Sequence, residues 1–273
     1  MIQLATSGGQ ISVLAAARAY INLNINDDAE ARRNFVVSAV KQMLANGKFS
    51  GKDVVASLPN DKLKITSVRL AETEAGAIEE ALKKEAAQRF GLDPEKDTIN
   101  YITAGDVRQG DEVKNEFIIF AADNESIKSH IELLDEMGLC PVGLDTIPGA
   151  LFRSFERTLR RQEDRERTTV FVDVGSRFTT VVFGRGGEIS FVKQIPIGGQ
   201  RFDQEIASKL GVSIEEAQTL RGMLRTGKTA NADFGAQGLS CGQAAATVQT
   251  GLDVSTRQVI VDAVGSVAEE LAK

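Results

Sequence analysis

The sequence predicts an α/β protein of two lobes, with a small α+β domain inserted into the first lobe. Short apolar runs bounded by glycine and proline alternate along the chain with segments of helical periodicity, the pattern of mixed strands and helices. The chain has 273 residues, enough for about two domains, and 42% of them are apolar, as in a globular protein with a sizeable core. A compact helix–strand–strand–helix pattern over residues 71–138 predicts the insertion.

Composition excludes several classes of function. The net charge is −6 and no basic block stands out, which argues against a dedicated nucleic-acid-binding protein. Two cysteines make neither a disulfide framework nor a metal site, and they fit a reducing cytoplasm. A single histidine, His130, excludes histidine-based triads and multi-histidine metal sites. No apolar run approaches the roughly 18 residues of a membrane-spanning helix, and the first residues lack a signal-peptide pattern.

The first lobe is expected to open with a β-hairpin of residues 1–6 and 11–21, joined by a Gly-Gly turn. Asp27 and Glu30 form a capping-box pattern, which predicts a helix from there to Gly47. Because helices of this length need an apolar face, the spacing of the apolar residues that follow supports the assignment.

The insertion and its flanks follow from turn residues and periodicity. Two strands, 54–58 and 63–70, precede a helix that begins near Thr73 and ends at Gly91. Strands 98–107 and 113–122 come next, and then a helix from Asp123 to Gly138. A short strand at 142–145 leads to a helix with Pro148 in its first turn and Leu159 on its apolar face. The charged stretch 156–167 is the expected domain boundary.

The second lobe is expected to open with three strands between Thr168 and Gly199. A helix that ends at Gly211 follows, and then one that starts at Ser213 with a Ser-x-x-Glu cap to Glu216. Residues 226–251 are rich in glycine, alanine, threonine and glutamine and are expected to form short helices. Residues 254–273 predict a final amphipathic helix.

The turn between the first two of these strands is the main candidate site. Asp173 ends an apolar strand, and its carboxylate could hold Mg²⁺ directly or through water. Gly175 would let the backbone turn sharply, at a dihedral closed to other residues. The amides from Ser176 through Phe178 could then converge on a phosphate oxygen. The alternative is an ordinary hairpin with a surface aspartate and a glycine-containing turn.

Two further features support the phosphate interpretation. Thr179 and Thr180 add hydroxyls, of which strand alternation aims only one at the site. Gly198 and Gly199 precede a helix, so a phosphate could approach the backbone and the positive end of that helix.

This segment, DVGSRFTTVVFGRGGEISFVKQIPIGGQRFD, resembles the second phosphate loop of the actin-like ATPase superfamily. The resemblance implies that Asp173, Gly175 and Thr179 hold the β and γ phosphates, with Asp173 reaching the metal through water. Ser176 and Arg177, in the same turn, are further candidates for binding the nucleotide. It also implies that Gly198 and Gly199 lie beside the phosphates. The stretch SIEEAQTLRG resembles the superfamily's ribose and adenine element, in which Glu216 matches and Arg221 stands where lysine is usual.

Within the superfamily, the chain resembles the PilM family of type IV pilus assembly proteins. Residues 52–70 and 126–155 carry this likeness together with the phosphate loop. It implies an actin-like (ribonuclease H-like) fold with an SHS2-like insertion. The division would be residues 1–70 with 139–163 for the first lobe, 71–138 for the insertion and 167–273 for an incomplete second lobe.

The family resemblance implies a cytoplasmic scaffold at the inner face of the inner membrane that binds ATP and Mg²⁺ and docks the cytoplasmic peptide of a PilN-like membrane protein. ATP would act by closing the lobes and so shifting partner affinity. The expected activity is at most a weak ATPase, with no catalytic residue assigned and no nucleic acid bound. The alternatives are an FtsA-like division protein, a GspL-like secretion protein and a sugar or acid kinase.

The resemblance also predicts motifs that this sequence does not contain. Family members begin with a first phosphate loop, D-I-G-S-S-x-x-K, and end with a Gly-Gly turn that holds the adenosine. Because the second phosphate loop keeps its glycines, we expect truncation at both ends rather than degeneration of the site.

Overall fold

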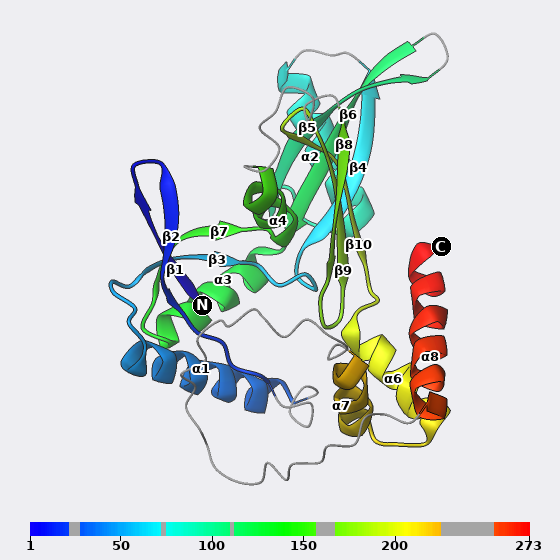
Figure 1. Ribbon diagram of the computed structural model, residues 1–273. Helices are drawn as coiled ribbons and strands as arrows, with labels where there is room; N and C mark the ends of the chain where they lie inside the picture. Colours follow the sequence, from blue (N-terminus) through cyan, green and yellow to red (C-terminus); the bar gives the residue numbers. More distant parts are fainter. Residues whose placement is uncertain (22–27, 72–74, 110–111, 157–166, 225–253) are drawn as a thin grey trace. The chain divides into compact units, whose positions relative to one another are not determined.

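The computed structural model describes residues 1–21, 28–71, 75–109, 112–156, 167–224 and 254–273. The chain forms two compact units (Figure 1). One contains residues 1–173 and 180–194, and the other contains residues 174–179 and 195–273. The division into lobes and insertion made from the sequence stays a prediction.

The first unit opens with an antiparallel hairpin, β1 (Ile2–Ser7) and β2 (Gln10–Ala16). Gly8 and Gly9 form its turn with φ of 58° and 79°, values that favour glycine. The predicted hairpin is confirmed, but its second strand ends at Ala16, five residues earlier than expected. Most of the apolar side chains of both strands are exposed.

Helix α1 (Ala29–Asn46) starts at Asp28, whose carboxylate accepts hydrogen bonds from the amides of Glu30 and Ala31. Asp28 is therefore the cap, and the assignment to Asp27 was one residue early; Asp27 itself lies outside the described residues. Gly47 ends the helix as predicted, and its amide donates to the carbonyl of Met43.

A two-stranded parallel sheet, β3 (Asp53–Ser57) and β7 (Cys140–Asp145), joins segments far apart in the sequence. Helix α3 (Asn124–Glu136) packs beside it with α1, through Val37, Leu134 and Leu139. Asp123 caps α3, and Gly138 follows its end with φ of 80°, as the sequence predicted.

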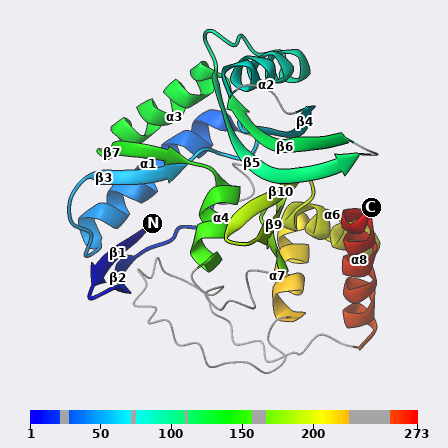
Figure 2. The same cartoon turned by 90° about the horizontal axis from the view of Figure 1, so that it is seen from above.

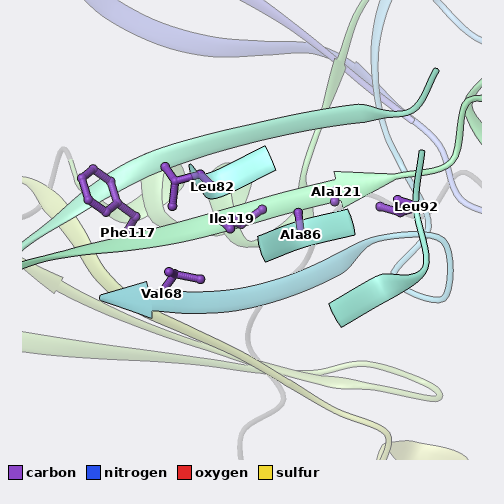
Figure 3. Close-up of a cluster of buried hydrophobic side chains, with 7 residues drawn as sticks. All are labelled: Val68, Leu82, Ala86, Leu92, Phe117, Ile119 and Ala121. Carbon is purple, nitrogen blue, oxygen red and sulfur yellow. The ribbon is translucent and has the colours of Figure 1, made fainter. Parts of the chain in front are cut away.

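A three-stranded antiparallel sheet in the order β4–β6–β5 follows, covered by helix α2 (Ala75–Phe90). Its strands are β4 (Lys64–Ala71), β5 (Thr98–Gln109) and β6 (Glu112–Ala122). Residues 64–71, assigned to the first lobe from the sequence, pair along their length with β6. Figure 3 shows the apolar side chains that close this layer: Val68, Leu82, Ala86, Leu92, Phe117, Ile119 and Ala121.

The opposite face of this sheet packs on a second cluster. Ile118 contacts Phe152 of helix α4 (Ile147–Glu156), together with two valines from strands β9 and β10. Those strands form a three-stranded sheet in the order β10–β9–β8, with β8 at Thr168–Val174, β9 at Thr179–Arg185 and β10 at Glu188–Ile195. The predicted continuation of α4 to Leu159 and the short helices at 226–251 lie outside the described residues, as does Thr73.

The second unit is mainly a group of three helices, α6 (Gly199–Leu210), α7 (Ile214–Leu224) and α8 (Val254–Ala272). Figure 2 shows them side by side, in yellow to red. Ile206, Ala217, Ile260 and Ala263 are fully buried among them. The predicted end of α6 at Gly211 and the predicted final helix are confirmed.

Candidate functional site

The turn after β8 is closed by a short hydrogen bond. The amide of Gly175 donates to the carbonyl of Phe178 at 2.9 Å, which folds residues 175–178 into a tight loop. Gly175 does not take a positive φ, so the expectation of a dihedral reserved for glycine is wrong. Glycine is favoured there by space, because a Cβ would lie 3.0 Å from the Phe178 carbonyl oxygen.

The second glycine pair packs directly against this loop. A Cβ on Gly198 would lie 2.7 Å from the carbonyl oxygens of Gly175 and Ser176, so only glycine fits. The amide of Gly199 donates to the Gly175 carbonyl, and the amide of Gln200 donates to the Ser176 carbonyl, both at 2.8 Å. The structure thus brings together two motifs that the sequence placed more than twenty residues apart.

These two hydrogen bonds change what the start of helix α6 can do. The first amides of a helix usually lack partners and can bind an anion. Here the amides of Gly199 and Gln200 already donate to backbone carbonyls, so they are not open to a phosphate. Within the described part of the chain, the amides of Ser176 and Phe178 donate to no protein acceptor. That these two amides bind an anion stays a prediction.

The two threonines after the loop are fully buried and have structural partners. The hydroxyl of Thr179 donates to the carbonyl of Ile197 at 2.7 Å, which ties the start of β9 to the residue before Gly198. The hydroxyl of Thr180 accepts a hydrogen bond from the side-chain Nδ2 of Asn60 at 3.4 Å, and the side-chain Nε2 of Gln194 donates to Asn60 Oδ1 at 2.8 Å. Thr179 therefore positions the backbone beside the loop.

The side chains expected at the metal and the ribose are exposed. Asp173 lies at the penultimate position of β8 with its side chain in solvent, and Ser176 and Arg177 are exposed in the loop. No group of three or more histidine, cysteine, aspartate or glutamate side chains suited to a metal occurs among the residues that the structure describes.

Helix α7 carries the predicted Glu216 in its first turn. The hydroxyl of Ser213 accepts a hydrogen bond from the Glu216 amide at 3.2 Å, so the predicted cap is confirmed. The Glu216 side chain is exposed. Arg221, which stands where the superfamily has lysine, forms a two-pronged ion pair with Asp203 of α6. Asp203 ends the segment that resembles the phosphate loop, but the sequence indicates no role for it, because a linear pattern does not show that its side chain is buried.

A separate groove of about 520 Å³ lies in the first unit beside helix α3. It is lined by side chains from α1, the β3–β4 connection and α3, including Arg33, Lys62 and Ser129. Hydrogen bonds from the Ser126 amide and hydroxyl lower the pKa of Asp123 at its rim. Burial lowers the pKa of His130, whose Nε2 is the one buried side-chain polar atom without a partner among the described residues.

Comparison with known proteins gives a consistent result. A family model described as type IV pilus assembly protein PilM matches residues 1–233. A solved structure described as the PilM–PilN type IV pilus biogenesis complex superimposes with a TM-score of 0.70 and 21% identity, over 99% of this chain and 70% of that chain.

Two other solved structures are similar to smaller parts of the chain. One is the ethanolamine utilization protein EutJ from Carboxydothermus hydrogenoformans, with 20% identity over 52% of this chain and 38% of that chain and a TM-score of 0.33. The other is the cytoplasmic domain of EpsL, an inner membrane component of the type II secretion system of Vibrio cholerae, with 14% identity over 65% of this chain and 63% of that chain and a TM-score of 0.37.

The fold is the actin-like α/β fold that the sequence predicted. None of the helices in the described ranges is both long enough and apolar enough to cross a membrane.

Proposed function

The chain belongs to the PilM family of type IV pilus assembly proteins, and we propose that it is a cytoplasmic ATP-binding scaffold that docks a short segment of a PilN-like membrane protein. The family match carries this proposal, because it covers both the loop at residues 175–178 and the groove beside α3. The similar solved structure is described as a complex with PilN, which supports a partner of that kind.

The nucleotide part of the proposal rests on the loop after β8. Its geometry supports a phosphate, because the amides of Ser176 and Phe178 donate to no acceptor among the residues that the structure describes. The amides of Ser176 and Phe178 and the Arg177 side chain would hold the phosphates, with Gly175, Thr179 and Gly198 fixing the loop. Asp173 would hold Mg²⁺ through water, and the metal would neutralise phosphate charge there. Gly199 would lie at the edge of the site beside the phosphates, and Glu216 would contact the ribose.

Calorimetric titration of the full chain with Mg-ATP tests this part. Asp173→Ala should weaken binding by about 10- to 100-fold, the usual loss for an outer ligand of a metal. Glu188→Ala is the matched control, because Glu188 is also an exposed acidic residue of the same sheet but lies at the start of β10. Absence of heat from the wild type at millimolar nucleotide would reject the nucleotide part, and equal losses in both variants would reject the role of Asp173.

The docking part of the proposal places the partner segment in the groove beside α3. A short peptide in a groove needs polar groups for its backbone and charge for its register. The groove offers the Ser129 hydroxyl and the Lys62 ammonium, which forms no ion pair within the described residues. Arg33 is instead held by Glu136 at 2.7 Å. The charge of Lys62 also helps to lower the pKa of Asp123, so a partner carboxylate or carbonyl would meet Lys62 in a groove that already holds that carboxylate.

Fluorescence anisotropy with a labelled N-terminal segment of a PilN-like protein tests the docking part. Lys62→Glu should weaken binding by about tenfold or more, since reversing a charge replaces attraction by repulsion. Lys128→Glu is the matched control, because Lys128 is on α3 but does not line the groove. If both variants bind like the wild type, the segment docks elsewhere; if the wild type does not bind, the PilN-like partner is rejected.

A further inference from the structure

One buried ion pair lies directly behind the candidate phosphate loop. Asp203 of α6 is 2% exposed, and Arg221 of α7 donates to both of its carboxylate oxygens, with Nε–Oδ1 at 2.6 Å and Nη2–Oδ2 at 3.1 Å. The Arg221 side chain is about one-third exposed. A carboxylate this deeply buried stays charged only with a well-placed partner, and the guanidinium provides one in a fork geometry that lysine could not reproduce.

The same guanidinium is adjacent to the glycine pair. A Cβ on Gly199 would lie 3.5 Å from Arg221 Nη2, so this nitrogen borders the backbone at the first residue of α6. That backbone in turn donates to the carbonyls of Gly175 and Ser176. A continuous series of contacts therefore runs from α7 through the ion pair and the start of α6 to the loop, all within the second unit.

We propose that Arg221 is a positioning residue: it acts through Asp203 to hold the start of α6 against the loop, and it does not itself contact the nucleotide. This inference rests on the proposed nucleotide function for its consequence in binding. It differs from the role that the resemblance to the ribose and adenine element would give to this position, because both prongs of the guanidinium are engaged by Asp203.

The two roles predict opposite results when both partners are removed. If Arg221 serves to neutralise Asp203, Arg221→Gln leaves a buried carboxylate without a partner, and removing the carboxylate as well should relieve the defect. If Arg221 contacts a phosphate or the base, removing Asp203 in addition cannot restore the lost contact. The cycle therefore separates positioning from direct binding.

Mg-ATP titration of four variants makes the test. We expect Arg221→Gln to weaken affinity on the order of tenfold, Arg221→Lys to weaken it less, and Asp203→Asn with Arg221→Gln to recover to within about threefold of wild type. Arg201→Gln is the control, because Arg201 lies on the same helix but pairs with Glu205 of α6 and Glu270 of α8, each at 3.1 Å, in place of Asp203. The inference would be overturned if the double variant bound Mg-ATP as weakly as Arg221→Gln, or if Arg221→Gln alone bound it as tightly as the wild type.

Hydrogen exchange at the amides of Gly199 and Gln200 gives a readout that is independent of nucleotide. In the wild type, the hydrogen bonds to the loop should protect both amides from exchange. The amides should lose this protection in Arg221→Gln and regain it in the double variant. If the wild type fails to bind Mg-ATP, the proposed function is rejected, while this exchange pattern still decides whether Arg221 positions the loop. Unchanged protection in Arg221→Gln would reject the positioning role.

Discussion

Gly198→Ala is the substitution to which the candidate site should be most sensitive. Gly198 has φ of −154°, an extended conformation that alanine also adopts, so the backbone dihedral itself carries no penalty. The penalty is steric, because the new methyl would lie 2.7 Å from the Gly175 carbonyl oxygen and from two backbone atoms of Ser176. Backbone atoms cannot rotate away as a side chain would, so the start of α6 must move off the loop.

The expected cost follows from these contacts. Forcing a methyl into a packed backbone interface costs about 1–3 kcal/mol. Moving α6 away also breaks the bonds from Gly199 and Gln200, which contribute about 0.5–1.5 kcal/mol each. Together the loss of stability in the second unit should be about 2–6 kcal/mol.

Gly199→Ala is the matched control for this prediction. A Cβ there meets Arg221 Nη2 at 3.5 Å and the Gly175 carbonyl oxygen at 3.6 Å, both ordinary contacts. Its stability should stay within about 1 kcal/mol of wild type. The chain has no tryptophan, so urea unfolding is best followed by far-UV circular dichroism. Equal stabilities for the two alanine variants would refute the claim that close backbone approach selects glycine at Gly198.

Three further predictions concern the first unit. His130→Gln should flatten the pH dependence of stability. Burial lowers the pKa of folded His130 below the ordinary 6.5, so its contribution to stability is complete above pH 6.5 and is lost as the pH falls toward the folded pKa. Urea midpoints between pH 7.5 and 5 that match wild type would contradict this. Gly184→Ala should destabilise by about 1–3 kcal/mol, since its Cβ would lie 2.4 Å from Phe152 Cε2; restoration by Phe152→Leu in the same urea assay would support the stated contact, and no loss would count against it. Asp123→Ala should cost about 1 kcal/mol by removing the bonds to Ser126 at the start of α3, with Asp123→Asn nearer to wild type, as thermal melts at pH 7 can measure.

Much of the fold followed from local signals in the sequence. Asp123 and Gly138 bound α3 as expected, because capping and left-handed termination depend on a few adjacent residues. The cap of α1 was misplaced by one residue, since Asp27 and Asp28 both suit the position and the neighbouring chain decides between them. The pairing of residues 64–71 with β6 could not be deduced, because strand partners depend on packing between distant segments.

The candidate site divides in the same way. The sequence by itself determined the fold family, through its resemblance to the actin-like superfamily, and the position of the turn after Asp173, because tight turns require particular residues at fixed spacing. Only the tertiary structure decided that the amides of Gly199 and Gln200 are already bonded to the loop, and that Arg221 is held by Asp203. Those contacts join segments more than fifteen residues apart, and their existence depends on burial and distance, which a one-dimensional pattern does not contain.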